Sequence, residues 1–460
     1  MLLTYWLDIV AAWRPAFMQN RLWRRAVIQA LGTLTAFGRR TLSRAIFAVG
    51  HQHQDWSADY RLHSRSAWNV DELFQPVLER SLPLCDGPFI AVALDDTRIH
   101  KTGRKLRSAF FQRDPLSPKF RFNLMWGLRF LQASLLVPLY RRQPAAPRAL
   151  PVRFVECPAV RKPRKKAPLE DWAAYRQLVR QTNLSQSALK MAASLRAALD
   201  RAGATVRTLL LVGDNSFCNR TLFTALGQRI DLIARARRDI RLCWRAPLGT
   251  ARFYDPHKFT PEQIRQDAAL AWHRTRLFAS GRWRGSLRFK QLMGVYWQSG
   301  AKQRPLRLLV IAPLPYRVPG RGRRYYHQPA FLLTTDLISS PTSLLQAYFD
   351  RWQIEVNHRE EKDTLGVGQA QLWSESSVPR QPAFVVAAYS ALLLAGLLAY
   401  GPTREARYEP LPKWRRRADR PSCLDLITQI RKEAIEHPEI LFTLLGLRIN
   451  WESLGLCAAA

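Results

Sequence analysis

Continuous apolar runs at three places in the chain predict strands that are buried on both faces. They occupy residues 89–94, 209–212 and 330–336, and aspartates follow the first two runs closely. Runs of this length without polar positions are typical of strands in a sheet that is covered on both sides. Because helical patterns separate these runs, the chain is predicted to have an α/β fold.

The clearest helical pattern lies at residues 185–202. Apolar residues recur there from Leu189 to Leu199 at steps of three or four, with Ser185 as a possible cap and Gly203 as the stop. This helix would lead directly into the apolar run at 209–212, as expected for alternating helices and strands.

The first 84 residues are rich in helical patterns and in arginine. A glycine-containing turn there precedes a short helical pattern at residues 41–47, which would expose Arg39, Arg40 and Arg44. Such a turn before a basic helix suits a helix-turn-helix that sets a helix against DNA. An ordinary basic helical bundle has the same pattern, so both interpretations stay open.

Two stretches interrupt the alternation of helices and strands. Residues 141–168 are rich in Pro, Arg and Lys and predict a basic loop or linker. Residues 236–328 contain four tryptophans and short alternating runs between turn residues, which predict a β-rich insertion.

A polar face with an unusual order follows the third apolar run. If residues 345–362 form one helix, four polar residues share an arc of about 60°: Tyr348, Arg351, Glu355 and Lys362. Four apolar residues form a stripe beside that arc: Leu345, Phe349, Trp352 and Val356. One edge of the helix would then be buried while a carboxylate, two cations and a phenol lie in a row beside it. This order suits a site that binds phosphate and a metal ion.

The charge of the chain is strongly positive. Its 460 residues include 71 Lys and Arg against 35 Asp and Glu, a net charge of +36. A compact particle with this excess repels itself, so a polyanionic partner is expected. The basic residues recur along the whole chain rather than in one amphipathic segment, which favours nucleic acid over an anionic membrane.

Cysteine usage and one long apolar stretch bear on the cellular compartment. The six cysteines have no spacing typical of a zinc site or a disulfide framework, which fits a cytoplasmic protein with reduced thiols. Between Arg380 and Arg404 lie 23 residues without charge. By length this stretch could span a bilayer, but it could equally be the buried central helix of a large α/β core. We expect the core helix and no membrane.

Three carboxylates are candidates for the chemistry. Asp96 and Asp214 follow the first two apolar runs, and Glu355 lies on the later helix. Chemistry in α/β sheets gathers at the carboxyl ends of strands. Three converging carboxylates can hold two divalent ions that activate a nucleophile and stabilise a leaving oxygen in phosphodiester chemistry. Their hard oxygen atoms favour Mg²⁺ or Mn²⁺.

Asp95 and Asp96 are neighbours on one strand and therefore point to opposite faces of the sheet. They cannot both be ligands in the same way. Asp96 is chosen here because Thr97 follows it directly.

The order Asp96, Asp214, Glu355, together with the spacing of Tyr348, Arg351, Glu355 and Lys362, resembles a known family. These are the bacterial cut-and-paste insertion-sequence transposases with a DDE triad and a Tyr-Arg-Glu-Lys signature. The segments Leu-Asp-Asp-Thr and Gly-Asp-Asn-Ser-Phe also look like the first and second aspartate regions of that family. The resemblance covers roughly residues 85–400.

The resemblance implies an RNase H-like core with a β-rich insertion between the second aspartate and the glutamate. Asp96, Asp214 and Glu355 would be both catalytic residues and metal ligands. Tyr348, Arg351 and Lys362 would bind DNA phosphates near the transposon end. The expected regions are 1–84, helical and DNA-binding; 85–235, first part of the core; 236–329, insertion; 330–400, second part of the core; and 401–460, basic, helical and C-terminal.

The function implied is that of a DNA transposase, which binds inverted-repeat ends, cleaves them and joins them to target DNA. Its partner would be double-stranded DNA, bound by a homodimer in the synaptic complex, and it would act in the cytoplasm on the nucleoid. Aromatic faces stack well on flipped bases, so a tryptophan of the insertion is a candidate for that contact, whereas a place in the core is the expected role of each of the four taken singly. The alternative is a transposase-derived DNA-binding protein that has lost catalysis.

Overall fold

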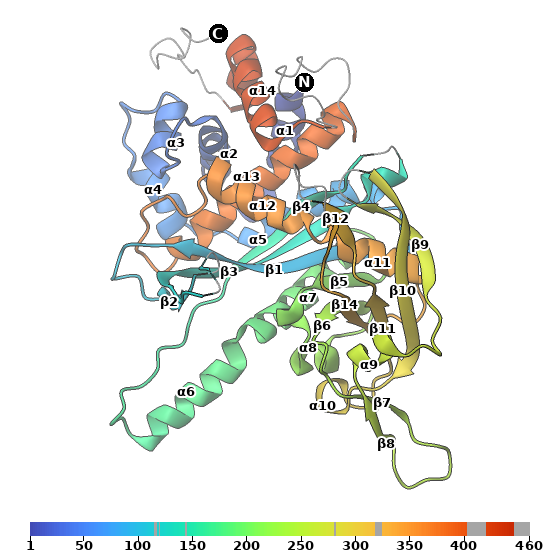
Figure 1. Cartoon of the computed structure of the whole chain (residues 1–460). Coiled ribbons are helices and arrows are strands. Elements are labelled where there is room, and N and C mark those ends of the chain that lie inside the picture. The colour runs from blue at the N-terminus through green and yellow to red at the C-terminus, as the bar shows by residue number, and fades with distance from the viewer. Residues whose placement is uncertain are drawn as a thin grey trace.

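The chain has a mixed α/β fold built on one large sheet (Figure 1). The computed structural model describes residues 1–114, 117–118, 120–142, 145–279, 282–317, 324–402 and 420–445. Ten strands form the sheet, in the order β2-β3-β1-β5-β6-β14-β11-β10-β9, and β4 also pairs with β3. The bounds of its first six strands are β1 (Ile90–His100), β2 (Phe110–Arg113), β3 (Leu124–Val137), β4 (Arg148–Glu156), β5 (Leu209–Gly213) and β6 (Ile230–Ala236).

Parallel pairing occurs only in the middle of the described sheet. β5 lies between β1 and β6 and is parallel to both, whereas β3 is antiparallel to β1 and β4 is antiparallel to β3. β5 contains only buried residues, as the apolar run predicts. Its carboxyl end therefore opens beside β1, where open sheets place their chemistry.

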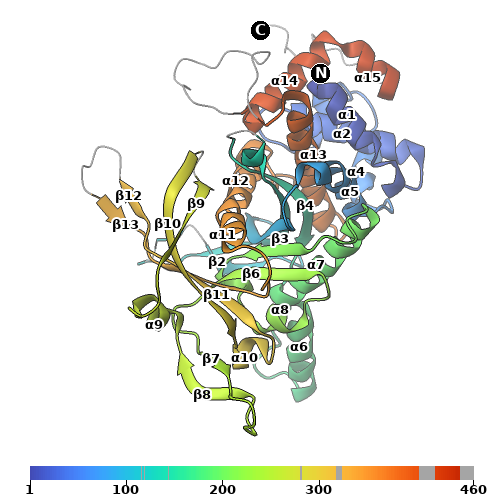
Figure 2. The ribbon, with the colours of Figure 1, turned by 90° about the vertical axis from the view of Figure 1, so that its right-hand side faces the viewer.

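The β-rich stretch does not form a sheet of its own. Its strands β9 (His273–Ala279), β10 (Arg282–Val295) and β11 (Leu306–Ile311) are joined to β6 through β14 (Ala330–Thr334) and so continue the central sheet. Two small hairpins stand apart from it: β7 (Leu242–Arg245) with β8 (Tyr254–Phe259), and β12 (Pro315–Arg317) with β13 (Arg324–Tyr326). The β7–β8 hairpin lies at the opposite end of the molecule from the terminal helices (Figure 2).

Helices cover the sheet and gather at the two ends of the chain (Figure 1). The described α-helices are α1 (Leu2–Ala11), α2 (Asn20–Thr35), α3 (Leu42–Ala48), α4 (Ser57–Ser64), α5 (Val70–Ser81), α6 (Leu169–Thr182), α7 (Leu184–Arg201), α8 (Arg220–Ala225), α9 (Pro261–Gln266), α10 (Gln298–Ala301), α11 (Pro341–Asp350), α12 (Gln353–Arg359), α13 (Ser377–Tyr400), α14 (Cys423–Glu436) and α15 (Pro438–Leu445). The basic run at 413–417 lies outside the described residues.

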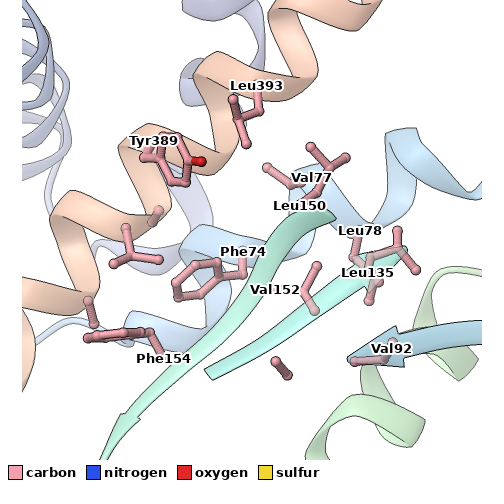
Figure 3. Packing of buried hydrophobic residues seen from close by; sticks show 14 of the residues in the cluster. Phe74, Val77, Leu78, Val92, Leu135, Leu150, Val152, Phe154, Tyr389 and Leu393 are labelled. Carbon is pink, nitrogen blue, oxygen red and sulfur yellow. The ribbon is translucent and has the colours of Figure 1, made fainter. Parts of the chain in front are cut away.

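α13 is the central helix of the core. It is long and apolar enough to cross a membrane, and 83% of its most apolar window is buried inside the protein. It packs against α1, α5 and β4. Tyr389 and Leu393 of α13 meet Phe74 and Val77 of α5 and Leu150 of β4 in one apolar layer (Figure 3). Within this helix the Ser390 hydroxyl donates to the Pro151 carbonyl at 2.6 Å.

The prediction of a loop over residues 141–168 is wrong at its centre, because β4 lies there. One proline and two arginines disguise this strand, and both arginines are buried. The Arg153 side chain is only 1% exposed and lies 3.4 Å from an Asp71 carboxylate oxygen. Pro151 sits where the pairing of β4 with β3 shifts register, which is where a strand tolerates proline.

The helix predicted at 185–202 is α7, with a different cap. The Asn183 side chain, not that of Ser185, accepts from the Gln186 backbone N–H at 3.0 Å. Gly203 follows with a φ of +82°, a conformation that ends helices and favours glycine.

The turn between α2 and α3 differs from its prediction in one arginine. Arg40 is buried instead of exposed, and its guanidinium donates to the carbonyls of Thr33 and, at 3.0 Å, Leu34. It therefore closes the carboxyl end of α2. The two helices approach closely: a Cβ on Gly32 would lie 2.2 Å from the Ala45 carbonyl oxygen. Arg39 and Arg44 remain exposed.

The first turn of α1 is capped by a side chain from the far end of the chain. The Glu433 carboxylate of α14 accepts from the backbone N–H groups of Leu2 at 3.2 Å and Leu3 at 2.7 Å. Glu433, Leu2 and Leu3 are all buried. A carboxylate at this position also complements the positive end of the helix dipole.

We expect Glu433→Ala to lower the free energy of unfolding by about 2 kcal/mol, because it leaves two buried N–H donors without an acceptor. Urea denaturation followed by circular dichroism measures this change. Glu436→Ala, an exposed position on the same helix, is the matched control and should change stability by less than about 0.5 kcal/mol. Equal effects for the two variants would contradict the assigned cap.

Candidate active site

The candidate residues come from three parts of the fold that meet beside β5. β1 contributes Asp95, and the turn after β5 contributes Asp214. The segment from α11 to the π-helical turn Glu360–Thr364 contributes the other candidates, which are Tyr348, Arg351, Glu355 and Lys362. That segment lies against β1, β4, β5 and β6. Residues more than 250 positions apart in the sequence therefore share one site (Figure 1).

The polar residues do not lie on one continuous helix. α11 ends at Asp350, α12 begins at Gln353, and the chain turns π-helical at Glu360. Arg351 and Trp352 form the junction. π-Helical turns are rare and occur most often at functional sites.

The apolar stripe predicted beside these residues is therefore only partly correct. Leu345 is fully buried, and Phe349 and Val356 are half-buried. Trp352, however, is 61% exposed.

The choice of Asp96 over Asp95 does not agree with the geometry. An Asp96 carboxylate oxygen lies 2.8 Å from Arg129 Nε and 3.9 Å from Arg98, on the face of β1 away from α12. Asp95 faces α12: its Oδ2 lies 3.8 Å from an Arg351 nitrogen and 3.9 Å from His358 Nδ1. The strand also continues to His100 instead of ending at the two acids. Asp95 thus takes the place predicted for Asp96.

Arg351 joins two of the three acids. Its guanidinium bonds Glu355 Oε1 at 3.0 Å and lies 3.8 Å from Asp95 Oδ2. The Arg351 side chain is mostly buried, so these interactions are only weakly screened by water. One cation therefore offsets two carboxylates in a partly dry site.

Negative charge and burial act together on these acids. Burial, helped by repulsion from Asp214 and Asp96 and opposed by Arg351, raises the pKa of Asp95 to about 7. Burial also raises the pKa of Glu355, where Arg351 again opposes the shift and Asp214 adds to it. Asp214 is thus close enough to repel both of the other acids.

Asp214 is held by the turn that follows β5. Its carboxylate accepts from the Ser216 backbone N–H at 2.8 Å and caps the short 3₁₀ turn Asn215–Phe217. Gly213 before it has no room for a side chain, because a Cβ there would lie 2.7 Å from Phe217. This packing fixes where the acid leaves the strand.

Tyr348 and Lys362 both lie near the acids. Burial raises the pKa of the Tyr348 phenol, and the charges of Arg235, Arg351, Asp214 and Glu355 all act on it. Burial lowers the pKa of Lys362, and the charges of Glu361, Asp363 and Asp95 oppose that shift. All three residues predicted to bind phosphate, Tyr348, Arg351 and Lys362, therefore lie within electrostatic reach of the acids.

No family model and no curated protein matches the chain.

The described residues contain no group of three His, Cys, Asp or Glu side chains arranged to hold a metal ion. The donor chemistry nevertheless fits a hard divalent cation. Asp95, Asp214 and Glu355 supply oxygen atoms, and their mutual repulsion and burial raise the pKa of two of them. In the protein alone, Arg351 provides the positive charge between Asp95 and Glu355.

Two further features of the site were not predicted from the sequence pattern. His358 lies one helical turn after Glu355 and faces Asp95; its Nε2 is buried without a hydrogen-bond partner among the described residues. Beside Asp214 lies a hollow of about 710 Å³ whose lining includes Arg235, Arg237 and Arg238. The run Ala-Arg-Ala-Arg-Arg at the end of β6 was the available signal, since β6 neighbours β5.

Proposed function

We propose that this protein is a DNA transposase, a metal-dependent enzyme that cleaves transposon ends and joins them to target DNA. One observation carries the proposal: Asp95 and Glu355 flank Arg351, and Asp214 lies within electrostatic reach of both acids, beside the parallel strands of a strongly basic protein. In this proposal the five strands β4, β3, β1, β5 and β6 are the RNase H-like core.

Asp95, Asp214 and Glu355 are the proposed ligands of two Mg²⁺ or Mn²⁺ ions. When bound, such ions activate the attacking water or 3′-hydroxyl and stabilise the leaving oxygen of the phosphodiester. Burial supports this role, since desolvated carboxylates attract cations more strongly than exposed ones. Asp96 has no part in the proposed ligand set, because Arg129 neutralises it on the other side of β1.

Arg351 is the proposed switch between the empty and the DNA-bound site. It balances Asp95 and Glu355 in the protein alone. With cations on the acids, its guanidinium is free to bind a phosphate through two parallel hydrogen bonds. Tyr348 would donate one hydrogen bond to the same DNA strand, and Lys362 would supply a point charge.

The N-terminal region is proposed to bind the transposon end. A hollow of about 550 Å³ between α2 and α4 is lined by Arg21, Arg24, Arg25 and Arg61. Arg25 Nε lies 3.4 Å from an Asp59 carboxylate oxygen and forms an ion pair with it. The other three arginines are therefore the candidate phosphate contacts. We further propose that the protein acts as a homodimer on double-stranded DNA, in the cytoplasm at the nucleoid.

A catalytically inactive DNA-binding protein is the second candidate. The observation in its favour is the absence of a ready-made metal group among the described residues. It predicts the same DNA affinity but no metal-dependent cleavage, so one assay separates the two.

Nicking of supercoiled plasmid tests the proposal. We expect the wild-type protein to nick the plasmid in Mg²⁺ or Mn²⁺ but not in EDTA. Glu355→Gln should lower the nicking rate at least about a hundredfold while plasmid binding persists. Glu170→Gln, an exposed acid on α6, is the matched control and should nick as the wild type does. Binding without nicking by the wild type would favour the inactive protein.

A further inference from the structure

A third basic hollow lies at the far end of β1 from the candidate active site. It has a volume of about 440 Å³ and is formed by three segments: the turn before α3, residues 100–106 at the carboxyl end of β1 and just beyond it, and residues 368–373 after the π-helical turn. Its rim carries Arg39, Lys105 and Trp373, all exposed. None of the described residues that line it is acidic.

The three segments are tied together by buried and half-buried contacts. Lys101 Nζ donates to the carbonyls of Gly368 and, at 3.0 Å, Ala370. The Arg40 backbone N–H donates to Gln369 at 2.7 Å. Gly368 has a φ of +94° and lies against Ile99, where a Cβ would be 2.1 Å from that side chain. The hollow is thus a fixed part of the fold.

Trp373 is the most unusual residue of this hollow. It is 83% exposed, in a protein that buries several of its other tryptophans. An exposed indole beside unpaired cations has the chemistry of a surface that stacks a nucleobase and binds its phosphates. Arg39 and Lys105 form no ion pair within the described part of the chain, so both are available to an anion.

The hollow and the active site lie along one side of β1. Asp95, Ile99 and Lys101 alternate onto the same face of the strand. The chain from Glu355 to Trp373 follows that face: His358 faces Asp95, Gly368 covers Ile99, and the Gly368 carbonyl accepts from Lys101. Six residues of strand separate Asp95 from Lys101, about 20 Å. That is the length of about six base pairs.

We propose that this hollow binds the DNA strand about six nucleotides from the cleaved bond, with one unpaired base stacked on Trp373 and the adjacent phosphates on Arg39 and Lys105. The inference rests on the proposed function, because the distance of six nucleotides is counted from the bond that the proposed active site cleaves. The desolvated Lys101, whose pKa burial lowers to about 8, holds the hollow together and is not itself a phosphate ligand.

Fluorescence anisotropy with two 20-mers tests the stacking: labelled (dT)20 and an abasic oligomer of the same length. Trp373→Ala should weaken (dT)20 binding about tenfold, the size of one stacked base, and leave binding of the abasic oligomer unchanged. Trp373→Phe should restore most of the affinity. Lys105→Glu should weaken the binding of both oligomers and lower its salt dependence. Lys190→Glu, exposed on α7 outside the hollow, makes the same charge change and should have the smaller effect.

Ultraviolet crosslinking of (dT)20 that carries 5-iodouracil locates the contact directly. The crosslinked base is expected in the tryptic peptide of residues 363–380, which contains Trp373. Unchanged (dT)20 affinity for Trp373→Ala together with no crosslink in that peptide would overturn the inference. If the wild type nicks plasmid in that case, the proposed function stands. If the wild type does not nick plasmid but Trp373→Ala binds (dT)20 weakly, the proposed transposase activity is contradicted, whereas the proposed stacking of a base on Trp373 is supported.

Discussion

Asp95→Asn is expected to reduce metal-dependent plasmid nicking at least about a thousandfold, while Asp96→Asn keeps it within about tenfold of wild type. The reason is the face of β1 on which each side chain lies. Asp95 faces Arg351 and interacts with Asp214, whereas Asp96 is paired with Arg129 on the other face. Initial rates of nicking in Mg²⁺, measured for both variants at equal protein concentration, compare two neighbouring residues with the same chemical change.

Folding must be checked separately in this pair. Asp96→Asn leaves the Arg129 guanidinium without its charged partner, so this variant is the one expected to lose stability, by about 1 kcal/mol. The assignment of Asp95 to the active site is supported if Asp96→Asn is less stable but active while Asp95→Asn is folded but inactive. The reverse pattern of activity would return the role to Asp96.

Glu361→Gln is expected to stabilise the protein in a strongly pH-dependent way. Glu361 is 1% exposed, and burial raises its pKa from 4.5 to about 8, against the opposing effects of Gln132 and Lys362. The folded protein therefore holds a proton that the unfolded chain releases above about pH 4.5. Wild-type stability falls as pH rises from there to about 8, since ionisation favours the unfolded chain. Glutamine has the shape of the neutral acid and no such penalty.

The difference in unfolding free energy between Glu361→Gln and wild type should grow by about 3 kcal/mol between pH 5 and pH 8 and then level off. Urea denaturation at several pH values measures it. Glu436→Gln, an exposed acid on α14, serves as the control and should show no comparable growth. A difference that stays constant with pH would mean that Glu361 is ionised in the folded protein.

Much of the core could be predicted because its strands are continuous apolar runs. β5 and β14 lie where the runs at 209–212 and 330–336 place them, and α7 matches its helical spacing. β4 was not found, since Arg148, Pro151 and Arg153 resemble loop residues. The partners that allow arginine to be buried in β4 come from distant segments: the Pro421 carbonyl for Arg148, and Asp71 for Arg153. No local pattern carries that information.

The candidate site was predicted in its composition but not in its geometry. Alternation along a strand separates Asp95 from Asp96, but it does not say which face α12 will cover. That depends on the pairing of β1 with β3 and on the path of a helix 260 residues later. The break at Arg351 has no signal either, because no glycine or proline occurs between Pro341 and Lys362.

The cap that Glu433 provides for α1 has a consequence for synthesis. Its partners are separated by 430 residues, and at about 5–20 residues per second the ribosome needs roughly 20 to 90 s to make that distance. Throughout this time the first turn of α1 lacks its acceptor, and α13, against which α1 packs, is also missing for most of it. The N-terminal helices are thus expected to stay protease-sensitive on the nascent chain and to become protected only when α14 emerges. The fold closes last at the segment that was made first.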